Sequence, residues 1–181
     1  MFVTVTGGSG SGKSEYSENL LLKLDGNEGG NRIYIATMEP FGEESIRRIK
    51  RHRAMRRGKG FETAECYINL KSVAFSDKNG KKPSVLLECM SNLTANELYR
   101  EDGAGEQAVE EILTGIDMLL SRTENLVVVT NEVFSDGIHY GDSTEYYRKL
   151  LGKINRELAS RCDVYVEVVY SIPVYYKGGP L

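Results

Sequence analysis

The residues whose types and spacing best support chemistry lie near the start of the chain. Positions 7–14 read Gly-Gly-Ser-Gly-Ser-Gly-Lys-Ser and satisfy the pattern GxxxxGK[ST] in full. Glycines let the backbone curl so that several N–H groups point into one hollow, which suits phosphate oxygens. Lys13 can then reach the β- and γ-phosphates as a catalytic cation, and the Ser14 hydroxyl can ligate Mg²⁺. The pattern therefore predicts ATP or GTP contacts from Gly7, Gly8, Ser9, Gly10, Ser11, Gly12, Lys13 and Ser14.

A second chemical feature is a histidine inside a strongly basic segment. Residues 47–59 carry eight Lys or Arg and no acidic residue, whereas the rest of the chain has 15 basic and 26 acidic residues. A solvated basic face is the ordinary interpretation of such a run, and a short nucleic-acid arm is another. In a third interpretation His52 is a nucleophile. Nearby arginines favour a neutral imidazole, which can attack phosphorus while the cations stabilise the departing polyphosphate. His139 has no comparable setting and is assigned a structural role.

P-loop folds often place a carboxylate near Mg²⁺, at the end of an apolar strand next to the phosphate loop. Two residues of this sequence are candidates for that carboxylate. Glu88 ends the run SVLLE, and Glu132 follows LVVVTN. The carboxyl ends of parallel strands face the ligand crevice, so either residue suits the role. Either is equally compatible with an ordinary carboxylate at a solvated strand end.

The elements that must position these residues alternate between strand and helix. Apolar β-branched runs predict strands at Phe2–Thr6, Arg32–Ala36, Ser84–Glu88, Leu126–Thr130 and Val164–Tyr170. Helical spacing predicts helices at Lys13–Leu24, from Glu43 to about Arg57, Ala104–Leu120 and Asp142–Ala159, with Asp142 as a cap and Glu145 three residues on. Turn-rich stretches at 25–31 and 76–83 connect them. A strand before the glycines and a helix after them argue against an accidental Gly/Ser turn.

Continuous apolar strands between helices predict an α/β fold of the P-loop NTPase type, RecA-like. Its mostly parallel sheet has helices on both faces and forms a single domain over residues 1–181. Neither a repeat nor a linker interrupts it.

Composition narrows the class of protein further. The 181 residues are 40% hydrophobic and 27% charged, with a net charge of −3, which argues against bulk nucleic-acid binding. No apolar run approaches the roughly 20 residues that a membrane span needs, and the N-terminus lacks the features of a signal peptide. We therefore expect a cytoplasmic protein. Cys66, Cys89 and Cys162 are widely spaced, which is typical of reduced thiols rather than a metal site.

Eight stretches together resemble one family. In chain order they read VTGGSGSGKS, YIAT, RIKRHR, FETAE, VLLEC, VTNEV, YRKLLGKINRELA and SIPVYYK, and they span Val5 to Lys177. The phosphate motif alone is generic, but RIxxH followed by TAE, LLEC and TNEV is specific. The chain is similar to the bifunctional adenosylcobinamide kinase / adenosylcobinamide-phosphate guanylyltransferases of cobalamin biosynthesis.

This resemblance implies roles for particular residues. His52 occupies the place of the histidine that takes GMP from GTP with release of pyrophosphate and passes it to adenosylcobinamide phosphate. In the preceding kinase step, ATP or GTP phosphorylates adenosylcobinamide. The resemblance also implies a homotrimer and Mg²⁺ at Ser14 and Glu88. Further positions that match nucleotide contacts in the family are Ala36, Thr37, Met38, Arg53, Ala54, Met55, Arg56, Glu65 and Glu88.

Several departures from the family pattern leave the phosphate and histidine machinery intact. Gly10 stands where the family usually carries Arg, and one extra residue lies between His52 and Phe61. Phe134 replaces a usual Gly, and the stretch SDGIHYGDST at 135–144 lacks the usual GIVP. These changes bear on the surfaces that face the corrinoid. A P-loop kinase without a covalent intermediate and a nucleotide-dependent regulatory module are the alternative functions.

Overall fold

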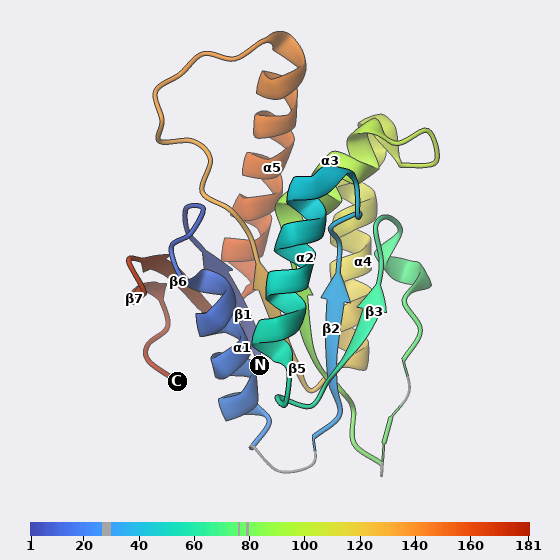
Figure 1. Ribbon diagram of the computed structural model, residues 1–181, viewed down its shortest axis with the longest axis vertical. Coiled ribbons are helices and arrows are strands. Elements are labelled where there is room, and N and C mark those ends of the chain that lie inside the picture. The colour runs from blue at the N-terminus through green and yellow to red at the C-terminus, as the bar shows by residue number, and fades with distance from the viewer. Residues whose placement is uncertain (27–29, 76, 79) are drawn as a thin grey trace.

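A seven-stranded sheet forms the centre of the molecule, in a computed structural model that describes residues 1–26, 30–75, 77–78 and 80–181 (Figure 1). The strand order is β3-β2-β4-β5-β1-β6-β7, and every pairing is parallel except that of β6 with β7. The bounds are β1 (Phe2–Thr6), β2 (Arg32–Ala36), β3 (Phe61–Glu65), β4 (Ser84–Glu88), β5 (Asn125–Val129), β6 (Val164–Val169) and β7 (Ile172–Lys177).

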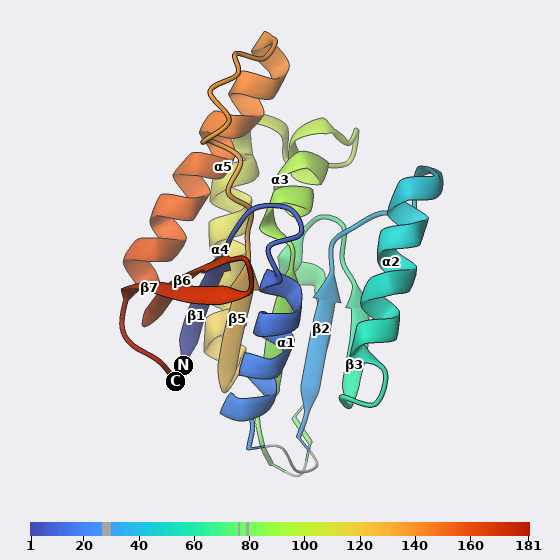
Figure 2. The ribbon, with the colours of Figure 1, turned by 60° about the vertical axis from the view of Figure 1, so that its left-hand side comes forward.

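Helices cover both faces of this sheet. The bounds are α1 (Lys13–Leu24), α2 (Gly42–Arg56), α3 (Met90–Tyr99), α4 (Ala108–Arg122) and α5 (Asp142–Arg161). Helices α1 and α2 lie on one face, and α3, α4 and α5 lie on the other (Figures 1 and 2). Within the described part of the chain, no helix is long and apolar enough to cross a membrane.

The central strands are apolar along their whole length because helices bury both of their faces. Every residue of β4 and β5 is buried. Since side chains alternate along a strand, Leu87 belongs to the core cluster that contains Ile112 and Ile116 of α4, whereas its neighbour Leu86 belongs to the cluster that contains Leu21 of α1. The predicted α/β fold with a mostly parallel sheet is confirmed.

All five predicted strands and all four predicted helices exist. The first three of these strands and the helix Lys13–Leu24 have the predicted bounds, and the other elements have shifted ends. The strand predicted at Leu126–Thr130 runs one residue earlier, and the last predicted strand ends at Val169. The helix predicted from Ala104 begins at Ala108, after a 3-10 turn at Gly105–Gln107. The connections at 25–31 and 76–83 lie partly outside the described residues. Asp142 was wrongly predicted as a cap: Gly141 holds that position, and the Glu145 carboxylate accepts the Tyr140 backbone N–H at 3.1 Å instead.

Three elements were not predicted. Strand β3 is an edge strand whose sequence FETAE is mostly exposed and carries two charges. Helix α3 begins two residues after β4, so nothing resembling a loop marks its start. Strand β7 contains Pro173 and follows a tight reversal at Tyr170 and Ser171, both with positive φ. Proline within a run lowers its apparent strand character.

Two glycines inside helices have different surroundings. At Gly115 of α4, an added Cβ would lie 2.5 Å from the Leu70 Cβ, so the glycine is what lets the 3-10 turn Leu70–Ser72 pack against α4. At Gly152 of α5, an added Cβ would meet nothing closer than 3.5 Å, a ring carbon of Phe134.

We expect Gly115→Ala to lower the free energy of unfolding by about 1–2 kcal/mol, because overpacking against Leu70 outweighs the gain in helix propensity. Urea denaturation measures the change. The matched control is Gly152→Ala, where no close contact opposes that gain of up to about 1 kcal/mol. Equal destabilisation by both substitutions would contradict the packing explanation.

Candidate active site

The glycine-rich loop lies where the sequence placed it, between β1 and the start of α1. Two of its glycines are required by close approach. Gly12 has φ +93°, and a Cβ there would lie 2.6 Å from the Ser171 hydroxyl oxygen; at Gly7 a Cβ would lie 2.6 Å from the Val168 carbonyl oxygen. The hairpin of β6 and β7 therefore supports the loop from outside.

Lys13 is the first residue of α1 and is 8% exposed. Its ammonium group donates a hydrogen bond of 2.9 Å to the Gly8 carbonyl, so the positive charge of Lys13 lies next to the backbone of the glycine-rich loop. Burial lowers the pKa of Lys13, an effect that the nearby carboxylate of Glu88 opposes and Arg48 reinforces. A cation in this place and the N-terminus of α1 together suit the phosphates of a nucleotide.

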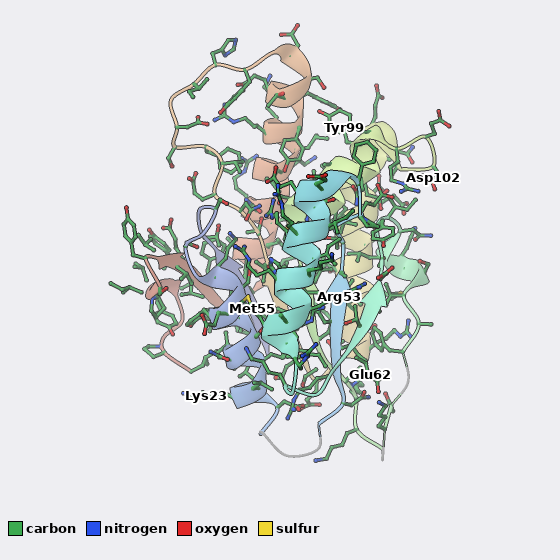
Figure 3. The ribbon with its side chains drawn as sticks, viewed as in Figure 1. Lys23, Arg53, Met55, Glu62, Tyr99 and Asp102 are labelled. Atoms are coloured by element: carbon green, nitrogen blue, oxygen red, sulfur yellow. The ribbon has the colours of Figure 1, made fainter. Side chains whose placement is uncertain are left out.

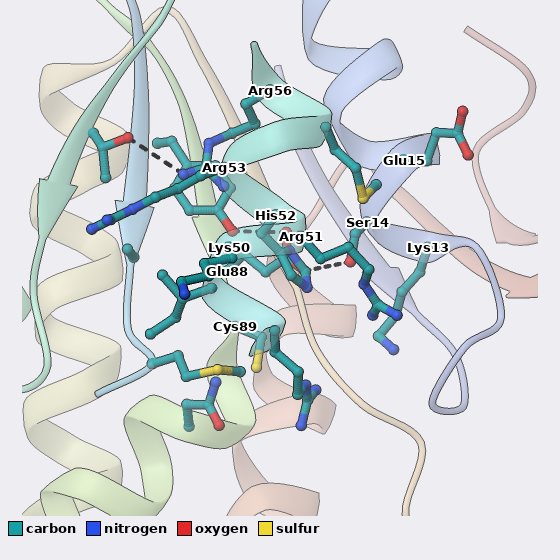
Figure 4. A pocket seen from close by; sticks show the side chains of 18 of the residues that line it. Lys13, Ser14, Glu15, Lys50, Arg51, His52, Arg53, Arg56, Glu88 and Cys89 are labelled. Carbon is teal, nitrogen blue, oxygen red and sulfur yellow. Dashed lines mark hydrogen bonds and ion pairs between the residues drawn. The ribbon is translucent and has the colours of Figure 1, made fainter. Parts of the chain in front are cut away.

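Glu88, the last residue of β4, connects three elements through one buried carboxylate (Figure 4). Ser14 Oγ donates to Glu88 Oε1, and the Tyr34 hydroxyl donates to Oε2 at 3.2 Å. His52 Nδ1 lies 3.4 Å from Oε1. Burial alone raises the pKa of Glu88, but the imidazole and the hydroxyls of Ser14 and Tyr34 outweigh it and hold the pKa below its usual value. The carboxyl group is therefore ionised.

His52 is one of the less exposed side chains of α2, with 12% of its surface accessible. It faces the sheet rather than the solvent, from the middle of the basic segment. Besides the arginines that the sequence indicated, the imidazole has the Glu88 carboxylate as a neighbour. This geometry favours the interpretation of His52 as a functional residue over that of a solvated basic face.

Charged contacts hold α2 against the rest of the molecule. The Arg56 guanidinium lies 3.4 Å from the centre of the Tyr34 ring, a cation–π arrangement. On the side of α2 toward β3, Arg53 donates to Glu65 at 2.9 Å, while Met55 points toward α1 (Figures 3 and 4). Only Arg56 among the residues of α2 is buried. Few apolar contacts therefore fix this helix.

Just beyond α2, Lys59 reaches across to α1. Its ammonium group lies 2.7 Å from the carboxylate of Glu18, which is 0% exposed. Burial raises the pKa of Glu18, and the Lys59 charge opposes that shift. This ion pair fixes the C-terminal end of α2 relative to the phosphate loop.

A cavity of about 540 Å³ opens between the glycine-rich loop, α2 and the carboxyl ends of β2 and β4. That volume is within the range of small-molecule sites. Most of the residues predicted to contact nucleotide line it: Ser9, Gly10, Ser11, Gly12, Lys13, Ser14, Ala36, Met38, His52, Arg53, Met55, Arg56, Glu65 and Glu88. We call it the nucleotide cavity.

Four residues predicted to contact nucleotide do not line the cavity. Gly7 and Gly8 contribute backbone carbonyls, which bond to Glu132 N–H and Lys13. Thr37 is buried, and its hydroxyl both donates to the Cys89 carbonyl and accepts from the Cys89 N–H. Ala54 is exposed on α2.

The structure separates the two candidate acids. Glu88 lines the nucleotide cavity, whereas the Glu132 carboxylate accepts the Phe134 N–H at 2.8 Å and lies outside it. The Ser14 hydroxyl and the Glu88 carboxylate are both oxygen donors, the ligand type that Mg²⁺ prefers. Because Mg²⁺ keeps several waters and phosphate oxygens, two protein groups fit its needs.

Other residues of the cavity were not indicated by the sequence. Arg48 and Arg51 line it from the basic helix, and Tyr34, Asn92 and Asn131 line it from the sheet and its carboxyl edge. Asn131 directly follows β5, so the same strand-end rule that selected Glu88 would have found it. Nothing in the sequence distinguished these two arginines from the other six basic residues of the segment.

The fold and the glycine-rich loop define an α/β P-loop protein, and solved structures agree. The flagellar accessory protein FlaH from Methanocaldococcus jannaschii superposes with a TM-score of 0.54 at 10% identity, over 98% of this chain and 78% of that one. The ATPase domain of G40P gives 0.51 at 8% identity, over 92% and 68%. At such identities these structures show the fold alone.

Sequence comparison identifies the family. Residues 3–175 match the family described as cobinamide kinase / cobinamide phosphate guanyltransferase, and the chain belongs to it. It is similar to the bifunctional adenosylcobalamin biosynthesis protein CobU of Salmonella typhimurium, with 29% identity over 191 residues that cover 98% of this chain and all of the relative. The Escherichia coli protein of the same name is also 29% identical, over 188 residues and the same shares. The resemblance inferred from the eight stretches is confirmed.

We expect Glu88→Gln to reduce the gain in GTP affinity caused by Mg²⁺ about 10–100-fold, since the neutral amide is a poorer partner for the metal. Calorimetric titration with GTP, with and without Mg²⁺, measures this gain. Glu132→Gln is the matched control, because its carboxylate lies outside the nucleotide cavity. An unchanged Mg²⁺ effect in Glu88→Gln would remove Glu88 from the metal site.

We expect Lys59→Met to lower the free energy of unfolding by about 3 kcal/mol at pH 7, because it leaves the Glu18 carboxylate buried without its partner. Loss of the lysine raises the pKa of Glu18 in the folded state further above its unfolded value. The contribution of Glu18 to stability is then complete below about pH 4.3 and falls as pH rises. The difference in unfolding free energy between wild type and Lys59→Met should therefore be largest near pH 7 and shrink toward pH 4. A deficit that does not vary with pH contradicts this account.

Proposed function

We propose that this protein catalyses both reactions of its family. In the first, ATP or GTP phosphorylates the aminopropanol hydroxyl of adenosylcobinamide. In the second, GMP passes from GTP to adenosylcobinamide phosphate through a covalent intermediate on His52, giving adenosylcobinamide-GDP and pyrophosphate. The homotrimer that the family resemblance implies is part of the same proposal.

One observation carries this proposal: His52 shares a cavity with the phosphate-binding lysine. Its Nδ1 lies 3.4 Å from the Glu88 oxygen that also accepts the Ser14 hydroxyl. A triphosphate held by the glycine-rich loop is therefore close to the imidazole. A solvated surface histidine would be largely exposed, whereas the His52 side chain is 12% exposed and lies beside Glu88.

In guanylyl transfer, the free nitrogen of His52, Nε2, attacks the α-phosphorus of GTP. An N–P bond forms as the bond from that phosphorus to the bridging oxygen breaks, and pyrophosphate leaves. A phosphate oxygen of adenosylcobinamide phosphate then attacks the same phosphorus and restores the free imidazole. The Glu88 carboxylate beside Nδ1 orients the ring and stabilises the positive charge that develops on it.

The cations of the cavity stabilise negative charge on the phosphates. Lys13 serves the β- and γ-phosphates in both reactions, and Arg48 and Arg51, which line the same cavity, stabilise the departing pyrophosphate. Mg²⁺ bound at Ser14 and Glu88 would neutralise phosphate charge. Among the described residues, no group of three or more His, Cys, Asp or Glu side chains could hold a metal ion.

The chain has two histidines, which makes a matched experiment possible. Incubation with GTP labelled at the α-phosphate should give a covalent, acid-labile adduct in wild type and in His139→Ala, whose imidazole is 91% exposed. His52→Ala should give no adduct, because it lacks the nucleophile. Retention of label on denaturing gels measures the outcome.

Two other outcomes would replace the proposal. Phosphorylation of adenosylcobinamide that survives His52→Ala, with no adduct in wild type, would indicate a P-loop kinase without a covalent intermediate. Nucleotide binding with neither product nor adduct would indicate a regulatory module.

A further inference from the structure

A second cavity, of about 880 Å³, lies between α5 and the hairpin of β6 and β7. We call it the α5 groove. The residues that matter here are Asn131, Phe134, Gly152, Arg156, Tyr165 and Tyr176. They come from α5, from the hairpin and from the segment after β5, and Figure 2 shows α5 beside β6 and β7. Its size fits a ligand larger than a nucleotide.

The α5 groove adjoins the nucleotide cavity. Asn131 lines both cavities, and Thr6, the residue just before the glycine-rich loop, lines the groove. The Glu132 N–H donates to the Gly7 carbonyl at 3.2 Å, which fixes the segment after β5 against that loop. A ligand in the groove therefore has a short path past Asn131 to the phosphates and His52.

Gly152 indicates that space in the groove is maintained. A glycine inside a helix costs about 0.5–1 kcal/mol relative to alanine. At Gly115 close packing against Leu70 explains that cost, but at Gly152 the nearest atoms, in the Phe134 ring, lie 3.5 Å from an added Cβ. Contacts within the protein therefore do not require this glycine, and a large ligand that approached the α5 backbone would.

The lining of the groove is amphipathic. The rings of Tyr165 and Tyr176 meet edge to face with centroids 6.3 Å apart, which gives an apolar wall. Arg156 makes no hydrogen bond or ion pair within the described part of the chain, so its donors are available. The Asn155 carboxamide is already engaged by the Thr130 hydroxyl at 2.7 Å. Such a lining suits a flat, largely apolar macrocycle that carries amide groups at its edge.

We propose that the α5 groove holds the corrin macrocycle of adenosylcobinamide and its phosphate. The aminopropanol arm reaches past Asn131 into the nucleotide cavity, while the ring packs on Tyr176 and its amide carbonyls accept from Arg156. The inference rests on the proposed function, because it names where the acceptor of both reactions binds. In this arrangement acceptor and nucleotide occupy different cavities.

Gly152→Leu tests the inference, because the new side chain fills the groove without touching the nucleotide cavity. The KM for adenosylcobinamide phosphate in GMP transfer should rise about tenfold or more, with little change in the rate of His52 labelling by GTP. Lys153→Leu is the matched control: it adds the same side chain one position along α5, at an exposed residue that does not line the groove. Its KM should equal that of wild type.

A second variant and a direct binding measurement distinguish loss of acceptor binding from misfolding of Gly152→Leu. Tyr176→Ala removes a ring that is 66% exposed, so the fold should persist while retention of adenosylcobinamide in ultrafiltration falls. An unchanged KM in Gly152→Leu, with normal retention in Tyr176→Ala, overturns the inference. So does a change of molecular mass in Gly152→Leu, which would make the groove an interface between copies of this chain.

The two proposals fail in distinguishable ways. Wild type that takes no label from GTP defeats the guanylyl-transfer proposal before any acceptor is added. Wild type that takes label and transfers it, with the same acceptor KM in Gly152→Leu, defeats only the placement of the macrocycle.

Discussion

The buried carboxylate of Glu88 is the interaction on which the site depends. A buried charge costs several kcal/mol unless it is paired and hydrogen-bonded. Here Ser14 of α1, Tyr34 of β2 and His52 of α2 together satisfy it. Each of these partners comes from a different element, so displacing any one of them leaves the charge less well compensated. A single carboxylate thus fixes the phosphate loop, the sheet and the basic helix relative to one another.

Electrostatics, rather than apolar packing, also positions α2. The helix buries only Arg56, and it contacts the sheet through the Tyr34 ring and the carboxylate of Glu65. Charged contacts are strong at short range but weak where water solvates them. The contacts that fix this helix are therefore those on the side that faces the sheet. Arg48, Lys50 and Arg51 of the same helix line the nucleotide cavity. The basic segment therefore both attaches α2 and supplies cations to the cavity, and a sequence count of its charges cannot separate these two groups.

The sequence predicted what short-range patterns determine. The glycine-rich loop, the buried strands and the long helices each follow from a local rule. Strand β3 was not predicted, because it is an edge strand with exposed, charged residues. The choice between Glu88 and Glu132 required knowledge of which strand ends lie next to the glycine-rich loop. In both cases, residues distant in sequence determine the outcome. Thr37 was matched to a nucleotide contact by the family resemblance; its hydroxyl bonds to the Cys89 backbone, and the nucleotide contact stays a prediction.

Strand order explains how two cavities share one edge of the sheet. Strand β5 lies between β4, which carries Glu88, and β1, which leads into the glycine-rich loop. The residue after β5 and its neighbour, Thr130 and Asn131, therefore emerge between the nucleotide cavity and the α5 groove. Because β6 and β7 extend the sheet beyond β1, the groove has a floor that a sheet ending at β1 would lack. A parallel sheet places the carboxyl ends of its strands at one edge, and here that edge brings the nucleotide cavity and the α5 groove to opposite sides of a single asparagine.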